Sequence, residues 1–163
     1  MEGEHYFSGN ALGTVGADGA VRLPPFVLAV LARRGAAGRI LFGAHDSAPC
    51  LTAFDAGRLP ALASDLERLK RRDEMGSDEA GDRHAIRARR AFGLNEAAEV
   101  GQDGRVALPP FLRARGGIGA RALFVGTGAE VEIWDADAAR AADDPALRAL
   151  AEYRLAEEEE RAR

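Results

Sequence analysis

One short motif occurs twice in this chain at a constant spacing. Residues 16–26 read GADGAVRLPPF, and residues 101–111 read GQDGRVALPPF. The two copies align without a gap, so that Asp18 corresponds to Asp103 and Phe26 to Phe111. Self-similarity at a fixed spacing is typical of chains built from repeated structural units. The sequence therefore predicts two copies of one small fold, which have to be explained together.

Each copy predicts a β-hairpin followed by a short helix. An Asp-Gly pair is a favoured turn between two paired strands, and this pair occurs at residues 18–19 and 103–104. The Pro-Pro pair that follows suits the first turn of a helix, where a backbone N–H would have no partner. Glycine commonly ends a helix. We therefore expect the first helix to end at Gly35 and the second at Gly116-Gly117.

A second pair of strands is predicted after each helix. Apolar segments occur at residues 39–43 and 50–54 in the first copy, and at 122–126 and 130–134 in the second. Each copy then ends on an aromatic residue followed by aspartate, at residues 54–55 and 134–135. A unit of this size buries too little apolar surface to be stable alone. We therefore expect the two copies to pack on each other or on another subunit.

The segment between the copies predicts a helical hairpin. Leu59, Leu62, Leu66 and Leu69 share one helical face, and Pro60 suits a first turn. The expected break lies near residues 75–78, with the second helix beginning at Asp82 as its N-cap and ending at Gly93. After the second copy, Asp144-Pro145 predicts another helix start. The acidic run at residues 157–160 predicts a solvated or frayed tail, and a dedicated partner site is the alternative.

These patterns divide the chain into four segments. They are a first repeat (7–55), a helical connector (56–90), a second repeat (91–136), and a C-terminal helix with an acidic tail (137–163). The longest apolar run, residues 26–32, is too short to span a bilayer, and residues 1–10 show no signal peptide. Cys50 lies in an apolar strand, where a small buried side chain is expected. We therefore expect a cytoplasmic protein with no membrane partner.

This order of motifs resembles the MraZ family, whose members contain two tandem SpoVT-AbrB domains. The resemblance extends from Phe7 to about Tyr153 and rests on residues 7–9 (FSG), the paired hairpin motifs, Arg89 ahead of Phe92-Gly93, and residues 132–135 (EIWD). It implies a mainly β, α+β fold, namely a double-split β-barrel of two AbrB-like repeats with pseudo-two-fold symmetry and peripheral helices. It also implies that subunits associate into a homo-oligomeric ring.

The same resemblance implies a function in transcription. Family members are regulators that bind double-stranded DNA at direct repeats in the promoter of the division and cell-wall gene cluster. We therefore expect a nucleoid-associated protein that is not an enzyme and has no cofactor, metal or small-molecule substrate.

The motif itself indicates how DNA could be contacted. Side chains alternate between the two faces of a strand, so inward Val21 and Val106 leave Arg22 and Arg105 outward. A guanidinium can donate two hydrogen bonds to guanine in the major groove, which is worth about 1–3 kcal/mol of discrimination. The glycine before each strand allows a positive φ or a close approach to phosphate. The predicted DNA-binding residues are Arg105, Gly104, Gln102, Arg22 and Gly19, and the candidate phosphate contacts are Arg87, Arg89 and Arg90.

The first copy departs from the family pattern. The family motif carries aspartate and arginine four residues apart, whereas here Gly16 precedes Ala20 and Gly101 precedes Arg105. Asp18 and Asp103, two positions later, are the candidates to take over part of the role of the missing aspartates. Arg22 keeps the outer face but lies about 6.6 Å further along the strand. Our hypothesis is that the second repeat reads DNA and the first mainly supports it.

Other classes of function stay open at this stage. The net charge of −4 is unusual for a DNA-binding protein, which commonly has a basic excess. The arginines of the connector are interspersed with acidic residues, which is typical of a solvated helix face. A protein-interaction module of antitoxin type, with the helix after Asp144 as its docking element, is one alternative. A ring-forming structural protein that has lost specific DNA contacts is the other.

Enzyme signatures are weak. His5, His45 and His84 lack the spacing of metal ligands, and they are expected in loops or on the surface. Residues 126–128 (GTG) lack the third glycine of a dinucleotide-binding loop, and a strand is expected where that loop needs a helix. No serine, cysteine or lysine lies in a nucleophile motif.

Overall fold

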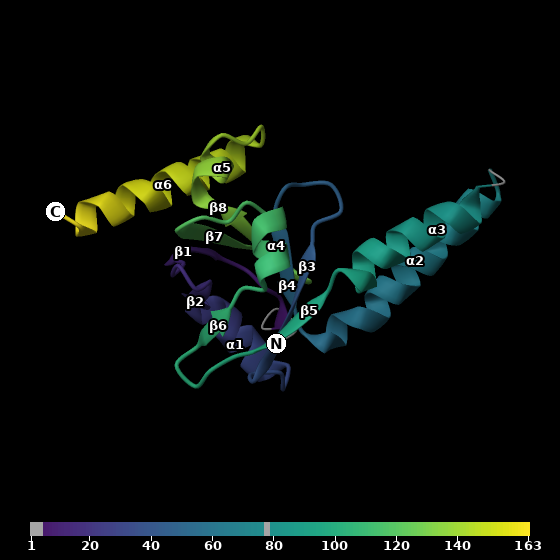
Figure 1. Ribbon diagram of the computed structural model, residues 1–163, viewed down its shortest axis with the longest axis horizontal. Helices are drawn as coiled ribbons and strands as arrows, with labels where there is room; N and C mark the ends of the chain where they lie inside the picture. Colours follow the sequence, from purple (N-terminus) through teal and green to yellow (C-terminus); the bar gives the residue numbers. More distant parts are fainter. Residues whose placement is uncertain (1–4, 77–78) are drawn as a thin grey trace.

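A six-stranded antiparallel sheet and a separate two-stranded ribbon form the centre of the computed structural model, which describes residues 5–76 and 79–163 (Figure 1). The strands are β1 (Asn10–Thr14), β2 (Ala20–Arg22), β3 (Arg39–Ala44), β4 (Leu51–Phe54), β5 (Glu96–Glu99), β6 (Arg105–Ala107), β7 (Arg121–Gly126) and β8 (Val131–Asp135). The helices are α1 (Pro25–Arg33), α2 (Leu59–Glu74), α3 (Ala80–Ala88), α4 (Pro110–Arg115), α5 (Ala136–Arg140) and α6 (Pro145–Arg161), with short turns η2 (Ala56–Arg58) and η3 (Arg89–Gly93). The predicted α+β class is confirmed.

The two repeats exchange strands. The order in the large sheet is β1-β7-β8-β4-β3-β5, so β1 of the first repeat pairs with β7 of the second, and β5 of the second pairs with β3 of the first. The remaining strands, β2 and β6, pair with each other across the repeats. Each repeat therefore completes the hydrogen bonding of the other.

The predicted hairpins are wrong in their pairing, although the turns are present. Gly19 N–H donates to Gly16 O at 2.9 Å, which closes a tight turn between β1 and β2. These two strands then enter different sheets instead of pairing with each other. The Asp-Gly signal is local and describes only the reversal of the chain. The partner of each strand is set by packing between the repeats.

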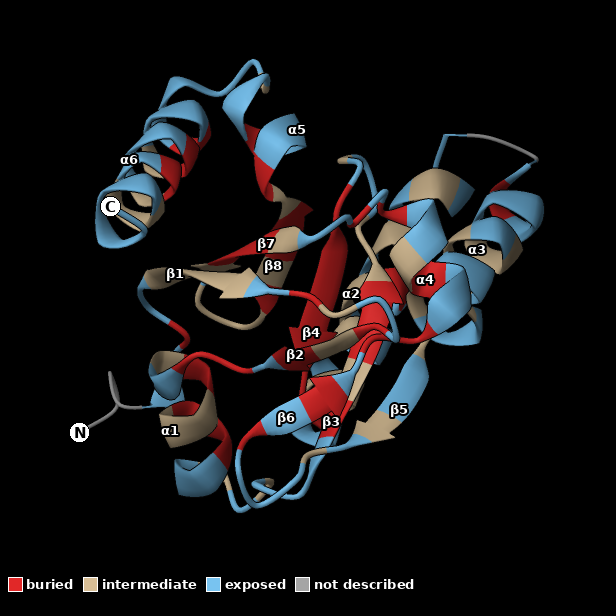
Figure 2. Cartoon of the chain, turned by 60° about the vertical axis from the view of Figure 1, so that its left-hand side comes forward, coloured by how far each residue is buried: buried red, intermediate tan, exposed pale blue. Residues whose placement is uncertain are grey.

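Both repeats contribute to one apolar core, which is drawn red in Figure 2. Its fully buried members come from α1, α4, the ribbon and the central strands, and include Val21, Leu31, Phe42, Leu108, Leu112, Phe124 and Ile133. The expectation that the copies pack on each other is confirmed. A smaller cluster, containing Cys50, Leu123, Trp134, Leu147 and Ala151, lies between the sheet and the C-terminal helices.

The connector is the helical hairpin that the sequence predicts, with one boundary changed. Helix α2 begins at Leu59 with Pro60 in its first turn, and the helical path after α3 ends at Gly93. Helix α3 begins at Ala80, so Asp82 lies inside its first turn instead of capping it. An aspartate is favourable in both places because both lie near the positive end of the helix dipole. Residues 77–78 of the predicted break lie outside the described residues.

The helix ends follow the predicted signals. Gly35 and Gly117 follow α1 and α4 with φ of +72° and +63°, which is the conformation that glycine supplies after a helix. Asp144 caps α6 by accepting a hydrogen bond from the N–H of Ala146 at 3.0 Å. None of the helices in residues 5–76 and 79–163 is both long and apolar enough to cross a membrane.

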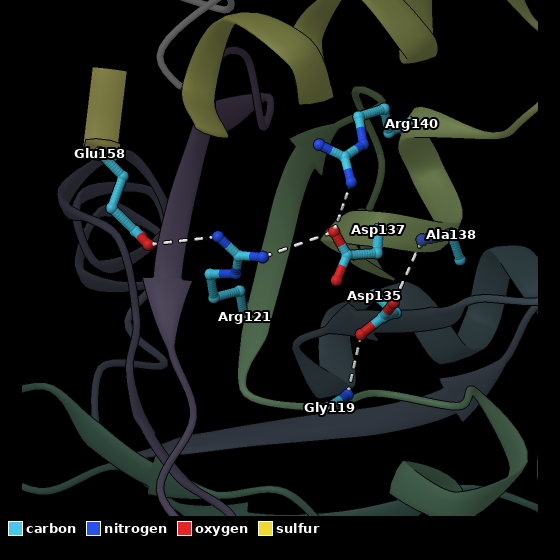
Figure 3. A network of polar contacts seen from close by, with 7 residues as sticks. All are labelled: Gly119, Arg121, Asp135, Asp137, Ala138, Arg140 and Glu158. Carbon is cyan, nitrogen blue, oxygen red and sulfur yellow. Dashed lines mark hydrogen bonds and ion pairs between the residues drawn. The ribbon is translucent and has the colours of Figure 1, made fainter. Parts of the chain in front are cut away.

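The acidic run at residues 157–160 is helical, because α6 continues to Arg161. Its first two glutamates are engaged. Glu157 accepts hydrogen bonds from Arg154 and Arg161, and Glu158 Oε1 lies 3.5 Å from Arg121 Nη1. Figure 3 shows that Arg121 also contacts Asp137 of α5, so β7 is joined to both C-terminal helices. The expected frayed tail is therefore corrected to an ordered helix end held by ion pairs.

Candidate nucleic-acid interface

The exposed face of the β2–β6 ribbon carries the two predicted arginines side by side. Arg22 is directly opposite Arg105 in the strand register, and Ala20 is opposite Ala107. Val21, which lies between Ala20 and Arg22 on β2, is buried, while Arg22 and Arg105 are both exposed. The predicted alternation of faces is confirmed. Because the two repeats carry their arginines at different motif positions, antiparallel pairing brings both to the same end of the ribbon.

The two arginines are closer than most cross-strand neighbours. Leu23 N–H donates to Gly104 O at 2.9 Å, so the next pair along the ribbon, Arg22 with Arg105, is a non-hydrogen-bonded pair. The Cα atoms of such pairs lie about 4.5 Å apart, compared with about 5.5 Å in hydrogen-bonded pairs. Like charges in this position repel each other. The ribbon therefore concentrates positive charge at one end.

The two guanidinium groups differ in their partners. Arg105 Nε lies 3.5 Å from Asp103 Oδ2, and both side chains are more than half exposed. Within the described residues, the guanidinium of Arg22 makes neither a hydrogen bond nor an ion pair. Arg22 is therefore available to an acceptor on a ligand, and Arg105 can exchange a weak, solvated partner for a better one.

Two equivalent turns set where the ribbon begins. Asp18 Oδ1 accepts the N–H of Ala20 at 3.0 Å, and Asp103 Oδ1 accepts the N–H of Arg105 at 3.1 Å. Both are side-chain hydrogen bonds to the backbone two residues on, which is a common turn device of aspartate. Asp103 therefore has two contacts with Arg105, one to its backbone and one to its side chain. The aspartates hold the turns, and Asp103 also orients the arginine.

The two glycines of the predicted site are buried beneath this face. Gly19 and Gly104 have φ of +86° and +82°. A Cβ added to Gly104 would lie 2.8 Å from Leu28 Cδ1, and one added to Gly19 would lie 3.3 Å from Leu108 O. These positions need glycine for the turn and for close packing between the repeats. Gln102, in contrast, is exposed in the turn before Arg105.

The other predicted contacts lie elsewhere on the molecule. Arg87 belongs to α3, and Arg89 and Arg90 belong to η3, on the side of the sheet away from the ribbon in Figure 1. Arg87 Nη1 lies 2.5 Å from Asp73 Oδ2, which ties α3 to α2. Arg89 and Arg90 are exposed. The structure does not bring these three arginines together with Arg22 and Arg105.

Arg113 is a positioning residue that the sequence did not single out. It lies on α4 of the second repeat, and its Nε donates to Ile118 O at 3.1 Å. Its Nη1 reaches Ala17 O at 3.4 Å, in the turn that leads to β2 of the first repeat. The second repeat thus braces the turn before Arg22. No local signal could have revealed this contact, since the partners are far apart in the chain.

A cluster of His45, Cys50 and Glu132 is the one group of metal-ligand side chains found among the described residues. Their ligand atoms all lie within 4.8 Å of one another. The sequence did not reveal this cluster, because it joins the β3–β4 loop of the first repeat to β8 of the second.

The hydrogen bonds of His45 argue against a metal there. Its Nδ1 accepts the N–H groups of Ser47 and Ala48 at 3.1 and 2.9 Å, so the imidazole proton belongs on Nε2, which lies 3.2 Å from Glu132 Oε2. A metal-bound histidine normally donates from its second nitrogen, and here that nitrogen faces two donors. Burial, and then the charges of Glu132 and Glu130, raise the pKa of the Cys50 thiol. The contacts therefore describe a hydrogen-bonded cluster that holds the loop.

Comparison with known proteins finds similar sequences among transcriptional regulators named MraZ, although no family model matches the chain. The transcriptional regulator MraZ of Gluconacetobacter diazotrophicus is 29% identical over 136 residues, which cover 82% of this chain and 80% of that protein. MraZ of Saccharophagus degradans is 28% identical over 133 residues, which cover 81% of this chain and 84% of that protein. Over about four fifths of its length, the chain is similar to these two MraZ proteins.

A shorter match has higher identity. MraZ of Paenarthrobacter aurescens is 51% identical over 37 residues, which cover 23% of this chain and 26% of that protein. The family resemblance predicted from the duplicated motif is confirmed by these MraZ relatives.

Proposed function

We propose that this protein is a sequence-specific DNA-binding regulator of transcription. The observation that carries the proposal is the exposed pair of Arg22 and Arg105 on a two-stranded ribbon. The major groove of B-DNA admits a two-stranded β-ribbon, and arginine is the side chain that most often recognises guanine there. The relatives named above are transcriptional regulators, which supports the same conclusion.

The remaining residues of the interface have different roles in this proposal. Gln102 is exposed beside Arg105 and carries an amide that can contact a base edge or a phosphate. Gly19 and Gly104 act indirectly, by shaping the turns that present the ribbon. Arg89 and Arg90 are exposed and stay candidate phosphate contacts. The first role of Arg87 is to hold α3 against α2.

We propose further that the subunits assemble into a ring and bind direct repeats in the promoter of the division and cell-wall gene cluster, in association with the nucleoid. The strand exchange between segments 7–55 and 91–136 supports their interpretation as the two halves of one double-split β-barrel. A ring presents many copies of the ribbon, and linked contacts gain affinity through effective concentration. That gain can offset the unfavourable net charge of −4.

A mobility-shift titration tests this proposal. The purified protein is titrated against its own upstream region and against a scrambled duplex of equal composition, at two salt concentrations. We expect preferential binding to the upstream region and weaker binding at higher salt, since each phosphate contact releases counterions. Arg148→Ala is a control variant that is expected to bind DNA as the wild-type protein does. Arg148 is an exposed arginine of α6, and among the described residues it contacts the Ala142 carbonyl and its own helix. Equal binding to both duplexes would contradict the proposal.

A second candidate function is a protein-interaction module or a structural ring. The net charge of −4 favours it. So does a hollow of about 750 Å³ beside α6; the apolar residues that line this hollow include Val125, Trp134, Leu147 and Leu150. The same titration separates the two candidates. Absence of any DNA preference, with an intact oligomer, would favour this second function.

A further inference from the structure

We propose that a cavity between the connector and the sheet binds a small zwitterion with an apolar body, which is the chemistry of a free apolar amino acid. The cavity has a volume of about 340 Å³, and small-molecule sites typically measure about 300–1,000 Å³. No residue of the β2–β6 ribbon lines it. The inference therefore goes beyond the proposed function, and each can fail without the other.

Part of the cavity wall is apolar. Leu62, Leu66 and Leu69 of α2 line it, together with Phe54 of β4 and Ile86 of α3. The three leucines belong to the helical stripe that the sequence predicts, but only Leu66 among them is buried. Leu62 and Leu69 border the hollow and stay half-buried. An apolar group placed there would remove their surface from water, which is favourable.

The rest of the wall carries four charged side chains that lack a full partner, namely Arg58, Arg90, Asp46 and Glu130. Arg58 Nε is buried and has no hydrogen-bond partner among the described residues. Glu130 Oε2 lies 3.8 Å from it, which is too far for a hydrogen bond. Arg90 and Asp46 are exposed, and within the described residues their side chains make neither a hydrogen bond nor an ion pair.

The other charged or titratable side chains of the cavity already have partners. They pair as Arg87 with Asp73, Asp65 with Arg68, and His45 with Glu132. Two arginines and two carboxylates are therefore left for a ligand, and their charges balance. A simple anion would be repelled by the two carboxylates, and a simple cation by the two arginines. A zwitterion offers its carboxylate to the arginines and its ammonium group to the carboxylates.

The environment of Glu130 supports this match. The residue lies in the loop between β7 and β8, and its side chain is 23% exposed. Burial raises the pKa of Glu130, although the charges of Arg58 and His45 oppose the change. The charged carboxylate is therefore incompletely compensated. An ammonium group beside it would stabilise the charged form, and a ligand carboxylate beside Arg58 would satisfy the buried N–H donor.

Packing holds the neighbouring polar part of the wall in place. Asn95 Nδ2 donates to Ala91 O at 2.8 Å, and both residues line the cavity. A Cβ added to Gly43 would lie 2.6 Å from Asn95 Oδ1 and 3.2 Å from Thr52 Oγ1, so the absence of a side chain there allows this close contact. A site that is built before the ligand arrives loses less entropy on binding.

Isothermal titration calorimetry of the purified protein with L-leucine tests the inference. Two analogues serve as matched ligands: 4-methylpentanoate lacks the ammonium group, and 3-methylbutylamine lacks the carboxylate. We expect saturable binding of one leucine per chain. Each analogue is expected to bind at least about tenfold more weakly than leucine, because each loses the hydrogen bonds of one charged group.

Substitutions locate the site. Glu130→Gln and Arg58→Gln each remove one charge from the wall and keep a polar side chain, and each is expected to weaken leucine binding about tenfold. Glu152→Gln is the matched control, because Glu152 is an exposed glutamate of α6 that does not line the cavity. Circular dichroism checks that the variants fold. The comparison of leucine with its analogues uses the wild-type protein and needs no variant.

Three results would overturn the inference. They are the absence of saturable leucine binding, an analogue that binds as tightly as leucine, and leucine binding that is unchanged in both Glu130→Gln and Arg58→Gln. The mobility-shift titration tests the proposed function separately and without added amino acid. Failure of the ligand site is therefore distinguishable from failure of DNA binding.

Discussion

Arg34 and Asp55 form a partly buried ion pair that joins the end of α1 to the end of β4. Arg34 Nη1 donates to Asp55 Oδ1 at 2.6 Å, and Asp55 also accepts the N–H of Gly57 at 3.2 Å. The same guanidinium donates from Nε to His5 O at 2.8 Å and lies 4.7 Å from the centroid of the Phe7 ring. The pair thus fixes the N-terminal segment, α1 and the start of the connector relative to one another.

Asp55→Ala is expected to lower the free energy of unfolding by about 2–3 kcal/mol. The substitution removes a charged hydrogen bond and leaves Arg34 without its carboxylate. Asp135→Ala is the matched control, because Asp135 also follows the last strand of a repeat but accepts only the N–H groups of Gly119 and Ala138. Loss of such a cap costs about 1 kcal/mol. Urea denaturation of both variants measures the difference, and equal losses would show that the ion pair contributes nothing.

Gly104→Ala is expected to destabilise the protein more than Gly35→Ala. Both glycines have positive φ, and an alanine in that conformation costs about 1–2 kcal/mol. Only Gly104 is also crowded, since its added Cβ would meet Leu28 Cδ1 at 2.8 Å, whereas nothing lies within 4 Å of a Cβ on Gly35. Thermal unfolding measures both losses. If the two variants unfold at the same temperature, packing between the repeats at Gly104 is looser than described.

The hairpin of α2 and α3 is expected to weaken in acid. The hydrogen bond from Arg87 is the main cause that lowers the pKa of Asp73. A carboxyl whose pKa is lower in the folded state stabilises it fully above the unfolded pKa, near 4. That contribution is lost as the pH falls through the lower folded value.

NMR titration of the Asp73 carboxyl measures this effect. Arg87→Ala is expected to return the pKa of Asp73 toward its ordinary value, and Asp73→Asn is expected to reduce the pH dependence of helix content as the pH falls below about 4. Arg68→Ala is the control, because Arg68 pairs with Asp65 on the same helix and is exposed. An unchanged Asp73 pKa in Arg87→Ala would show that the ion pair is absent in solution.

Cys50 is expected to react slowly with iodoacetamide in the folded protein at pH 8. Burial is the largest cause that raises the pKa of its thiol, followed by the charges of Glu132 and Glu130. The reactive species is the thiolate, which is therefore scarce. Mass spectrometry measures the alkylation rate with and without denaturant. Equal rates in both conditions would mean that the β3–β4 loop does not protect the thiol.

Local features of the sequence determined the elements and their ends. Proline at residues 25, 60, 110 and 145 lies in the first turn of a helix, and glycine follows α1 and α4 with positive φ. The inward valines and outward arginines of the ribbon also follow from strand alternation alone. These features depend on contacts within a few residues, which a sequence pattern records directly.

The tertiary structure alone decided which strands pair. The Asp-Gly turns are satisfied whether β1 pairs with β2 or with β7, so the local pattern does not distinguish the two arrangements. The exchange buries both repeats in one core, which neither could complete alone. It also places Arg22 beside Arg105 and His45 beside Glu132. Such contacts arise between segments far apart in the chain, because burial of a shared apolar core selects the partner of each strand.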